Sequence, residues 1–94
     1  MNKQRKFYEE QARKTLLDLR VDKDVSYVDL VNRLRDQGVL LNRRTLTNKL
    51  NRGRYTFTFA LQVLAALGET SFRVPQLPAE LRRQEPQKPQ DENL

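Results

Sequence analysis

The chain has 94 residues, 37% of them hydrophobic, and a formal net charge of +6 from 18 Lys and Arg against 12 Asp and Glu. It contains no Cys and no His, which excludes a disulfide scaffold, a zinc finger and catalysis by a Cys or His side chain. The length suits one small domain, and the excess of positive charge makes nucleic acids and acidic membranes the partners to consider.

No segment is apolar over the roughly 20 residues that a transmembrane helix needs. The N-terminus begins with basic residues, but Glu9 and Glu10 fall where a signal peptide has its apolar stretch. We therefore expect a cytoplasmic protein with no membrane span, no metal and no cofactor. An enzyme is not expected, because no acid–base pair stands out and the acidic residues are spread along the predicted helices.

The first half of the chain predicts two helices. Apolar residues spaced by three and four indicate a helix over about residues 6–20. A second helix follows Ser26, a good N-cap with Asp29 three residues later, and Gly38 supplies its left-handed stop. The supporting apolar stripes are Tyr8, Ala12, Leu16 and Leu19 in the first helix, and Tyr27, Leu30, Val31 and Leu34 in the second.

The second half predicts two more helices. Asn42 is a good N-cap for a helix over about residues 43–52, which has Leu46 and Leu50 on one side and ends at Gly53. Beyond an aromatic segment, Thr56 or Thr58 caps a fourth helix that runs to Leu67 and closes at Gly68. Its expected apolar face comprises Phe57, Leu61 and Leu64, together with Phe59 and Leu67.

The chain is expected to divide into a flexible basic N-terminus (residues 1–5), a folded domain (6–73) and a disordered tail (74–94). The tail holds all four prolines and too few apolar residues to offset the entropy of ordering it. Alternatively, it orders on a partner through Leu77 and Leu81. The basic N-terminus could contact DNA as an arm, through Lys3, Arg5 and Lys6. The predicted fold is all-α, a compact four- to five-helix bundle with a disordered C-terminal tail.

The second and third predicted helices, with their short connection, have the outline of a helix-turn-helix. Residues 37–68 contain five basic residues and no acidic one, so +5 of the net charge lies in this window. A basic face can be mere solvated surface, but here the basic residues share a helix with Asn and Thr rather than Glu. At about 100° per residue, Arg, Asn and Thr lie opposite Leu46 and Leu50, and these types contact bases and phosphates.

Residues 26–68 resemble the lambda-repressor-like helix-turn-helix domains, the group of XRE-type, Cro and phage-repressor relatives. The resemblance lies in SYVDLVNRLRDQGVLLNRRTLTNKLNRG, an aromatic turn and LQVLAALG. More narrowly, LTNKLNRGRYTFTFALQVLAALG is similar to a bacterial domain family of uncharacterised function on the same framework. The chain departs from the group in its longer turn, and in having Arg43 and Arg44 where the recognition helix usually begins with Gln.

The resemblance implies a sequence-specific regulator of transcription that inserts the helix at about residues 43–52 into the major groove of double-stranded DNA. A small module reads too few base pairs alone, so we expect a homodimer, with the fourth helix and Phe72 at its interface. A protein-interaction module (a phage-type inhibitor or adaptor) and a non-specific nucleic-acid binder are the alternatives. The expected DNA-binding residues are Arg43, Arg44, Thr45, Thr47, Asn48, Asn51, Arg52 and Arg54.

Overall fold

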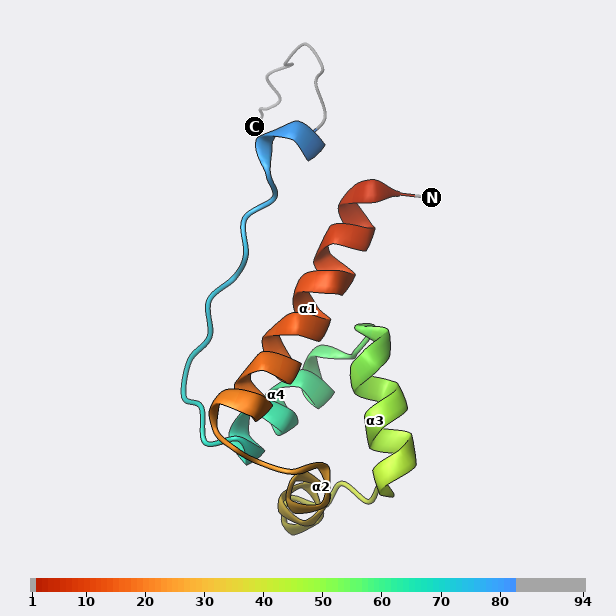
Figure 1. The fold of residues 1–94 in the computed structure, drawn as a ribbon, viewed down its shortest axis with the longest axis vertical. Helices are drawn as coiled ribbons and strands as arrows, with labels where there is room; N and C mark the ends of the chain where they lie inside the picture. Colours follow the sequence, from red (N-terminus) through yellow and green to blue (C-terminus); the bar gives the residue numbers. More distant parts are fainter. Residues whose placement is uncertain (1, 83–94) are drawn as a thin grey trace, which may run out of the picture.

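The computed structural model describes residues 2–82 of the chain, and Figure 1 shows their path. Within that range every regular element is helical, which confirms the predicted all-α class. None of the helices in this part of the chain has the length and apolar character needed to cross a membrane. The elements are α1 (Lys3–Asp22), α2 (Tyr27–Asp36), α3 (Arg43–Arg52), α4 (Phe57–Ala66) and a short 3-10 turn, η1 (Ala79–Leu81).

Helices α2, α3 and α4 each begin at the kind of polar cap that the sequence predicts. In every case the cap's side-chain oxygen accepts a hydrogen bond from a backbone N–H in the first turn, which would otherwise lack a partner. The fourth helix begins after Thr56 rather than Thr58, which decides between the two alternatives. The three bonds are Asp29 N–H to Ser26 at 3.0 Å, Thr45 N–H to Asn42 at 2.7 Å and Phe59 N–H to Thr56 at 3.0 Å.

Helix α1 starts earlier than the sequence analysis expected. It begins at Lys3 instead of about residue 6, because the side chain of Asn2 caps it by accepting a hydrogen bond from the N–H of Arg5 at 3.0 Å. Residues 2–5 are therefore a cap and a first helical turn, which corrects the expectation of a flexible segment there. Residue 1 lies outside the described part of the chain.

The core collects leucines and valines from all four helices, as Leu16, Leu30, Leu46 and Val63 illustrate. On α4, Phe59, Leu64 and Leu67 are buried as expected, but two other residues of the expected face need a correction. Phe57 and Leu61 are 67% and 45% exposed, whereas the buried side chains are Phe59, Val63, Leu64, Ala66 and Leu67. The segment is apolar around most of its circumference, so its pattern does not decide which side faces the core, and packing against α1 and α2 does.

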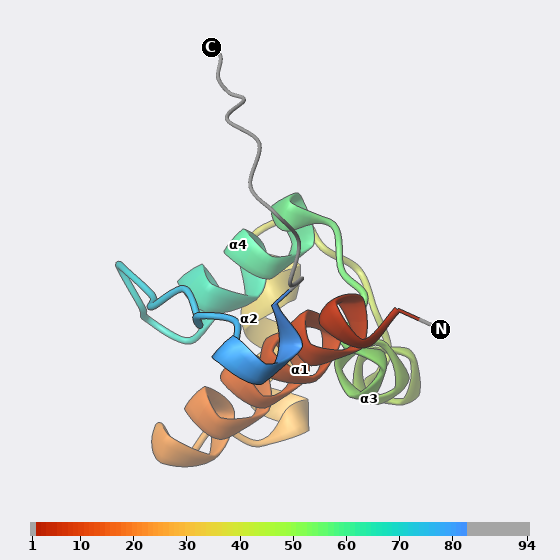
Figure 2. The same ribbon diagram turned by 90° about the horizontal axis from the view of Figure 1, so that it is seen from above.

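Helix α3 lies at one edge of the molecule, against α1 and α2 (Figures 1 and 2). In both views the segment of residues 69–78 lies on the other side of α1. This layout leaves the outer side of α3 uncovered by any other described element.

The chain after α4 was expected to be disordered from about Val74. Up to Arg82 it instead follows a defined path along α1 and ends in η1, with Leu77 and Leu81 half-buried. The side-chain N–H of Gln4 donates a hydrogen bond to the carbonyl oxygen of Leu81 at 2.8 Å, which joins this segment to the start of α1. The rest of the expected tail, residues 83–94, lies outside the described residues.

Candidate nucleic-acid interface

The outer side of α3 presents the residues that the helical wheel assigned to it. Leu46 and Leu50 are fully buried, which fixes the rotation of the helix. Thr47 and Lys49 are half-buried at its flanks. The exposed residues of the candidate site are Arg43, Arg44, Thr45, Asn48, Asn51 and Arg52 on α3, and Arg54 just beyond it.

A short turn joins α2 to α3. With Gln37 and Asn42 as the flanking caps, only residues 38–41 lie between them, and Gly38 has a φ of +85°. Val39 and Leu41 pack against the core and so fix the position of the turn. In Figure 1 α2 is seen end-on while α3 is seen from the side, so the two helices are steeply inclined. The short turn therefore sets α3 at a steep inclination to α2.

The five basic residues of the acid-free window have different surroundings. Arg43, Arg44 and Arg52 make no ion pair within residues 2–82. The ammonium of Lys49 lies 5.0 Å from the centre of the Phe59 ring, a cation–π distance. The Nε of Arg54 lies 3.1 Å from a carboxylate oxygen of Glu9 on α1. One acidic residue thus reaches a window that contains none in the sequence.

The charges at the start of α3 oppose the helix dipole. The first turn of α3 has no acidic residue, and Arg43 and Arg44 occupy its positive end. A cation in this position costs a helix about 0.3–1 kcal/mol, whereas an anion is stabilised there. A negatively charged ligand at this end would therefore relieve an unfavourable interaction that the isolated chain retains.

Thr47 contributes less to the outer surface than the sequence suggested. Its hydroxyl donates a hydrogen bond to the carbonyl oxygen of Arg43, one turn earlier, at 2.8 Å. The single donor of the hydroxyl is thereby used within the helix, and only its acceptor positions are left for a ligand. Asn48, by contrast, is exposed and its side chain makes no hydrogen bond within residues 2–82.

The end of α3 packs directly on the backbone of α1. Gly53 has a φ of +70°, and a Cβ at this position would collide with the carbonyl oxygen of Glu9. This close approach sets Glu9 beside Arg54, and Arg5 joins the same carboxylate at 3.2 Å. The sequence predicts Arg5 as part of a basic arm, but it does not predict Glu9 or the pairing of Glu9 with Arg5 and Arg54. The spacing of four between Arg5 and Glu9 along α1 was the available signal, but nothing in the pattern connects them to Arg54.

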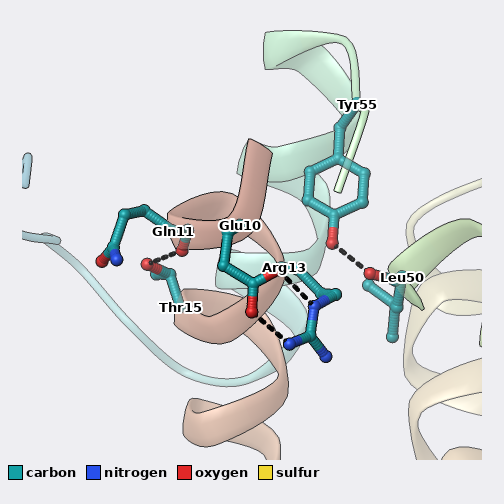
Figure 3. Close-up of polar contacts among 6 residues, drawn as sticks. All are labelled: Glu10, Gln11, Arg13, Thr15, Leu50 and Tyr55. Carbon is teal, nitrogen blue, oxygen red and sulfur yellow. Dashed lines mark hydrogen bonds and ion pairs between the residues drawn. The ribbon is translucent and has the colours of Figure 1, made fainter. Parts of the chain in front are cut away.

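Tyr55 ties the segment after α3 back to that helix (Figure 3). Its hydroxyl donates a hydrogen bond to the carbonyl oxygen of Leu50 at 2.6 Å, and its ring packs on Phe59. Burial raises the pKa of Tyr55 to about 12, so the hydroxyl keeps its proton at neutral pH. Nearby on α1, a hydrogen bond from Arg13 lowers the pKa of Glu10 below its usual range (Figure 3).

A second surface feature is an open apolar hollow of about 190 Å³ between α1, α4 and residues 72–75. Its rim includes exposed aromatic side chains, Tyr8, Phe57 and Phe72. None of the residues that line it belongs to α3. Within residues 2–82, the basic outer side of α3 and this apolar hollow are therefore separate surfaces.

Comparison with known proteins gave one result. A protein-family model described as a domain of unknown function (DUF6471) matches residues 8–72, which is more than half of the chain. The matched range includes α2, α3 and α4 and most of α1. Neither the curated proteins nor the solved structures gave a match.

Proposed function

We propose that the chain, which belongs to the DUF6471 family, is a sequence-specific regulator of transcription that binds double-stranded DNA through α3. The observation that supports this proposal is the outer side of α3, where exposed Arg and Asn side chains have no ion pair within the described residues. Arg forms paired hydrogen bonds with guanine and Asn with adenine, so the surface offers donors that suit base edges in the major groove.

In this proposal α3 is the recognition helix of a lambda-repressor-like helix-turn-helix, and it acts on DNA in the cytoplasm. Arg44 and Asn48, one turn apart on the exposed side, read bases. Arg43 and Arg52, at the two ends of the helix, and Arg54 beyond it contact phosphates. Helix α2 crosses the DNA backbone above the groove and holds α3 at its angle.

We further propose that the protein works as a homodimer, because one helix of this length reads too few base pairs to select a site in a genome. The apolar hollow supports this proposal, since Tyr8, Phe57 and Phe72 expose apolar area around it. A two-fold dimer would place its recognition helices in successive major grooves, about 34 Å apart.

Selection of bound oligonucleotides from a random pool, followed by titration at several salt concentrations, tests the DNA proposal. Three arginines at phosphates, namely Arg43, Arg52 and Arg54, would give a log–log salt slope of about −2.7. Arg44→Ala and Asn48→Ala should each reduce the preference for the selected site by about 1–3 kcal/mol. Arg54→Ala should instead weaken binding to every sequence alike, because a phosphate contact does not distinguish bases.

Two outcomes would contradict the proposal. A wild-type chain that binds no duplex at low salt is not a DNA-binding protein. If all three substitutions weaken selected and random duplexes equally, then only the alternative of a non-specific nucleic-acid binder remains.

The apolar hollow also favours a second candidate function, a protein-interaction module on a helix-turn-helix scaffold. In that case substitutions on α3 would leave binding to the partner protein unchanged, whereas polar substitutions at Phe57 would abolish that binding. Absence of duplex binding, together with association through this surface, would support the second candidate over the first.

A further inference from the structure

Two arginines from distant parts of the chain share one carboxylate oxygen. The Nε of Arg5, in the first turn of α1, lies 3.2 Å from Oε2 of Glu9, and the Nε of Arg54 lies 3.1 Å from the same atom. The Glu9 side chain is only 21% exposed, whereas those of Arg5 and Arg54 are 74% and 65% exposed. The carboxylate therefore lies beneath two guanidinium groups that extend into solvent.

The two ion pairs leave most of the N–H donors of Arg5 and Arg54 available to bind a ligand. A guanidinium has five N–H donors in a fixed plane, and both contacts to Glu9 are made through Nε. The Nη groups of Arg5 and Arg54 form no hydrogen bond with residues 2–82. A carboxylate that holds one edge of an arginine orients the opposite edge, which suits the two-pronged binding of a phosphate.

The first turn of α1 adds a second observation that points to an anion. Lys3 and Arg5 lie at the positive end of the helix dipole, and this turn has no acidic residue. Lys6 follows directly, so three cations gather where an isolated helix favours carboxylates. Because Asn2 caps the helix, these side chains project from a fixed turn rather than from a flexible arm.

The position of this turn makes it continuous with α3. The start of α1 and the whole of α3 lie on the same side of the molecule in both ribbon views (Figures 1 and 2). The contact of Gly53 with the backbone of Glu9 fixes the junction between them. A line of positive charge thus runs along α3, through Arg54 and Arg5, to the first turn of α1.

We propose that the first turn of α1 is a second phosphate-contacting element, and that Glu9 is the positioning residue that turns Arg5 and Arg54 toward the DNA backbone. This inference rests on the proposed function of α3 and extends the interface from the groove to the flanking phosphates. The ligand of this surface is the phosphate backbone of double-stranded DNA, which is read here without regard to sequence.

The contact by α1 is tested with Arg5→Ala, with Arg73→Ala as the matched control. Both variants lose one exposed positive charge, but Arg73 lies in the segment on the other side of α1 from α3. Arg5→Ala should make the log–log salt slope shallower by about 0.9 and weaken selected and random duplexes equally. Arg73→Ala should leave the slope unchanged.

The positioning role is tested with Glu9→Ala and with Asp18→Ala as its control, since each variant removes one negative charge from α1 and Asp18 is exposed and outside the cluster of Arg5, Glu9 and Arg54. If net charge alone matters, both variants bind duplex more tightly than the wild type. If Glu9 positions the arginines, Glu9→Ala binds several-fold more weakly although its net charge is higher, and Asp18→Ala does not. Glu9→Gln, whose amide oxygen still accepts hydrogen bonds, should restore part of the loss, and in an Arg5→Ala, Arg54→Ala background Glu9→Ala should lose its effect.

Circular dichroism on every variant checks that the helices remain formed. Two results would overturn the inference while the proposed function stands, given a wild-type chain that binds duplex. One is an unchanged salt slope in Arg5→Ala, and the other is Glu9→Ala that binds as tightly as Asp18→Ala. A wild-type chain that binds no duplex would overturn both the inference and the proposed function.

Discussion

At the scale of single residues, Gly53 has the most constrained position of the three glycines. Gly38, Gly53 and Gly68 all have positive φ angles, but a Cβ at Gly38 or Gly68 would meet nothing within 4 Å. At Gly53 it would meet the backbone of Glu9 and the Cβ of Arg13. This residue therefore needs both the left-handed conformation and the missing side chain, because α3 ends directly against α1.

Comparison of Gly53→Ala with Gly38→Ala separates these two requirements. Gly38→Ala should cost about 1–2 kcal/mol in the free energy of unfolding, from the positive φ alone. Gly53→Ala should cost at least about 2 kcal/mol more, because α1 and α3 must move apart to admit the methyl group. Urea denaturation of both variants measures the difference. Equal losses would mean that the contact between the two helices adjusts without cost.

At the scale of elements, α3 combines a favourable cap with unfavourable charges. Asn42 satisfies the first turn, but Arg43 places a positive charge at the positive end of the dipole, while Arg52 in the last turn complements the negative end. A cation at the positive end of the helix lowers the stability of the free chain, and such a cost is expected where the same residue binds an anion.

Charge reversal at the two ends of α3 should therefore have opposite effects on stability. Arg43→Glu should raise the free energy of unfolding by about 0.3–1 kcal/mol, and Arg52→Glu should lower it by a similar amount. Both variants should bind duplex DNA more weakly, because each replaces a cation at the proposed interface with an anion. Urea denaturation and duplex titration measure the two effects. If Arg43→Glu is less stable than the wild type, the dipole argument for α3 is wrong.

The elements also differ in how well the sequence predicts them. The ends of α2 and α3 follow from local signals, namely the caps Ser26 and Asn42 and the glycines that follow each helix. The start of α1 was missed because no apolar repeat precedes Tyr8, although Asn2 is itself a good capping residue. The buried side of α4 was predicted only in part, because tertiary packing chooses among several apolar sides: Phe59, Leu64 and Leu67 are buried as expected, whereas Phe57 and Leu61 are exposed.

In the candidate interface, too, the sequence predicts what depends on local pattern and misses what depends on packing between helices. The outward side of α3 could be predicted because the helix has only two apolar residues, Leu46 and Leu50, and they define its buried direction. The contact between Glu9 and Arg54 could not, because it depends on where the end of α3 meets α1. A count of charge along the sequence therefore describes α3 well and misses the carboxylate that joins it in space.

At the scale of the whole molecule, the basic line and the apolar hollow lie on different elements. The hollow is bordered by α1, α4 and residues 72–75, so a second copy could cover it while the outer side of α3 remains free. The hollow has exposed aromatic residues, and a cluster of exposed apolar side chains of this kind favours burial against another protein surface.

Sedimentation velocity over a range of concentrations tests the proposed homodimer. We expect a dimer for the wild-type chain and a shift to monomer for Phe72→Ser, which removes an aromatic ring from the hollow without disturbing the core. The control is Val28→Ser, because Val28 is a comparably exposed apolar residue, at 55%, on α2 and outside the hollow. A wild-type chain that stays monomeric at every concentration would exclude this interface.

The hydrogen bond between Gln4 and Leu81 has a consequence for the order of folding. These residues are 77 positions apart, and the bond is the only one that residues 70–82 make to another described element. One hydrogen bond offsets little of the conformational entropy that the chain loses when so long a loop closes. Residues 70–82 should therefore join the fold after the four helices have packed together. By the same reasoning this segment should be the first part of residues 2–82 to open, and within that range amide hydrogen exchange should be fastest there. Each opening would remove Phe72 and Val74 from the hollow and expose more of the apolar surface of α1 and α4.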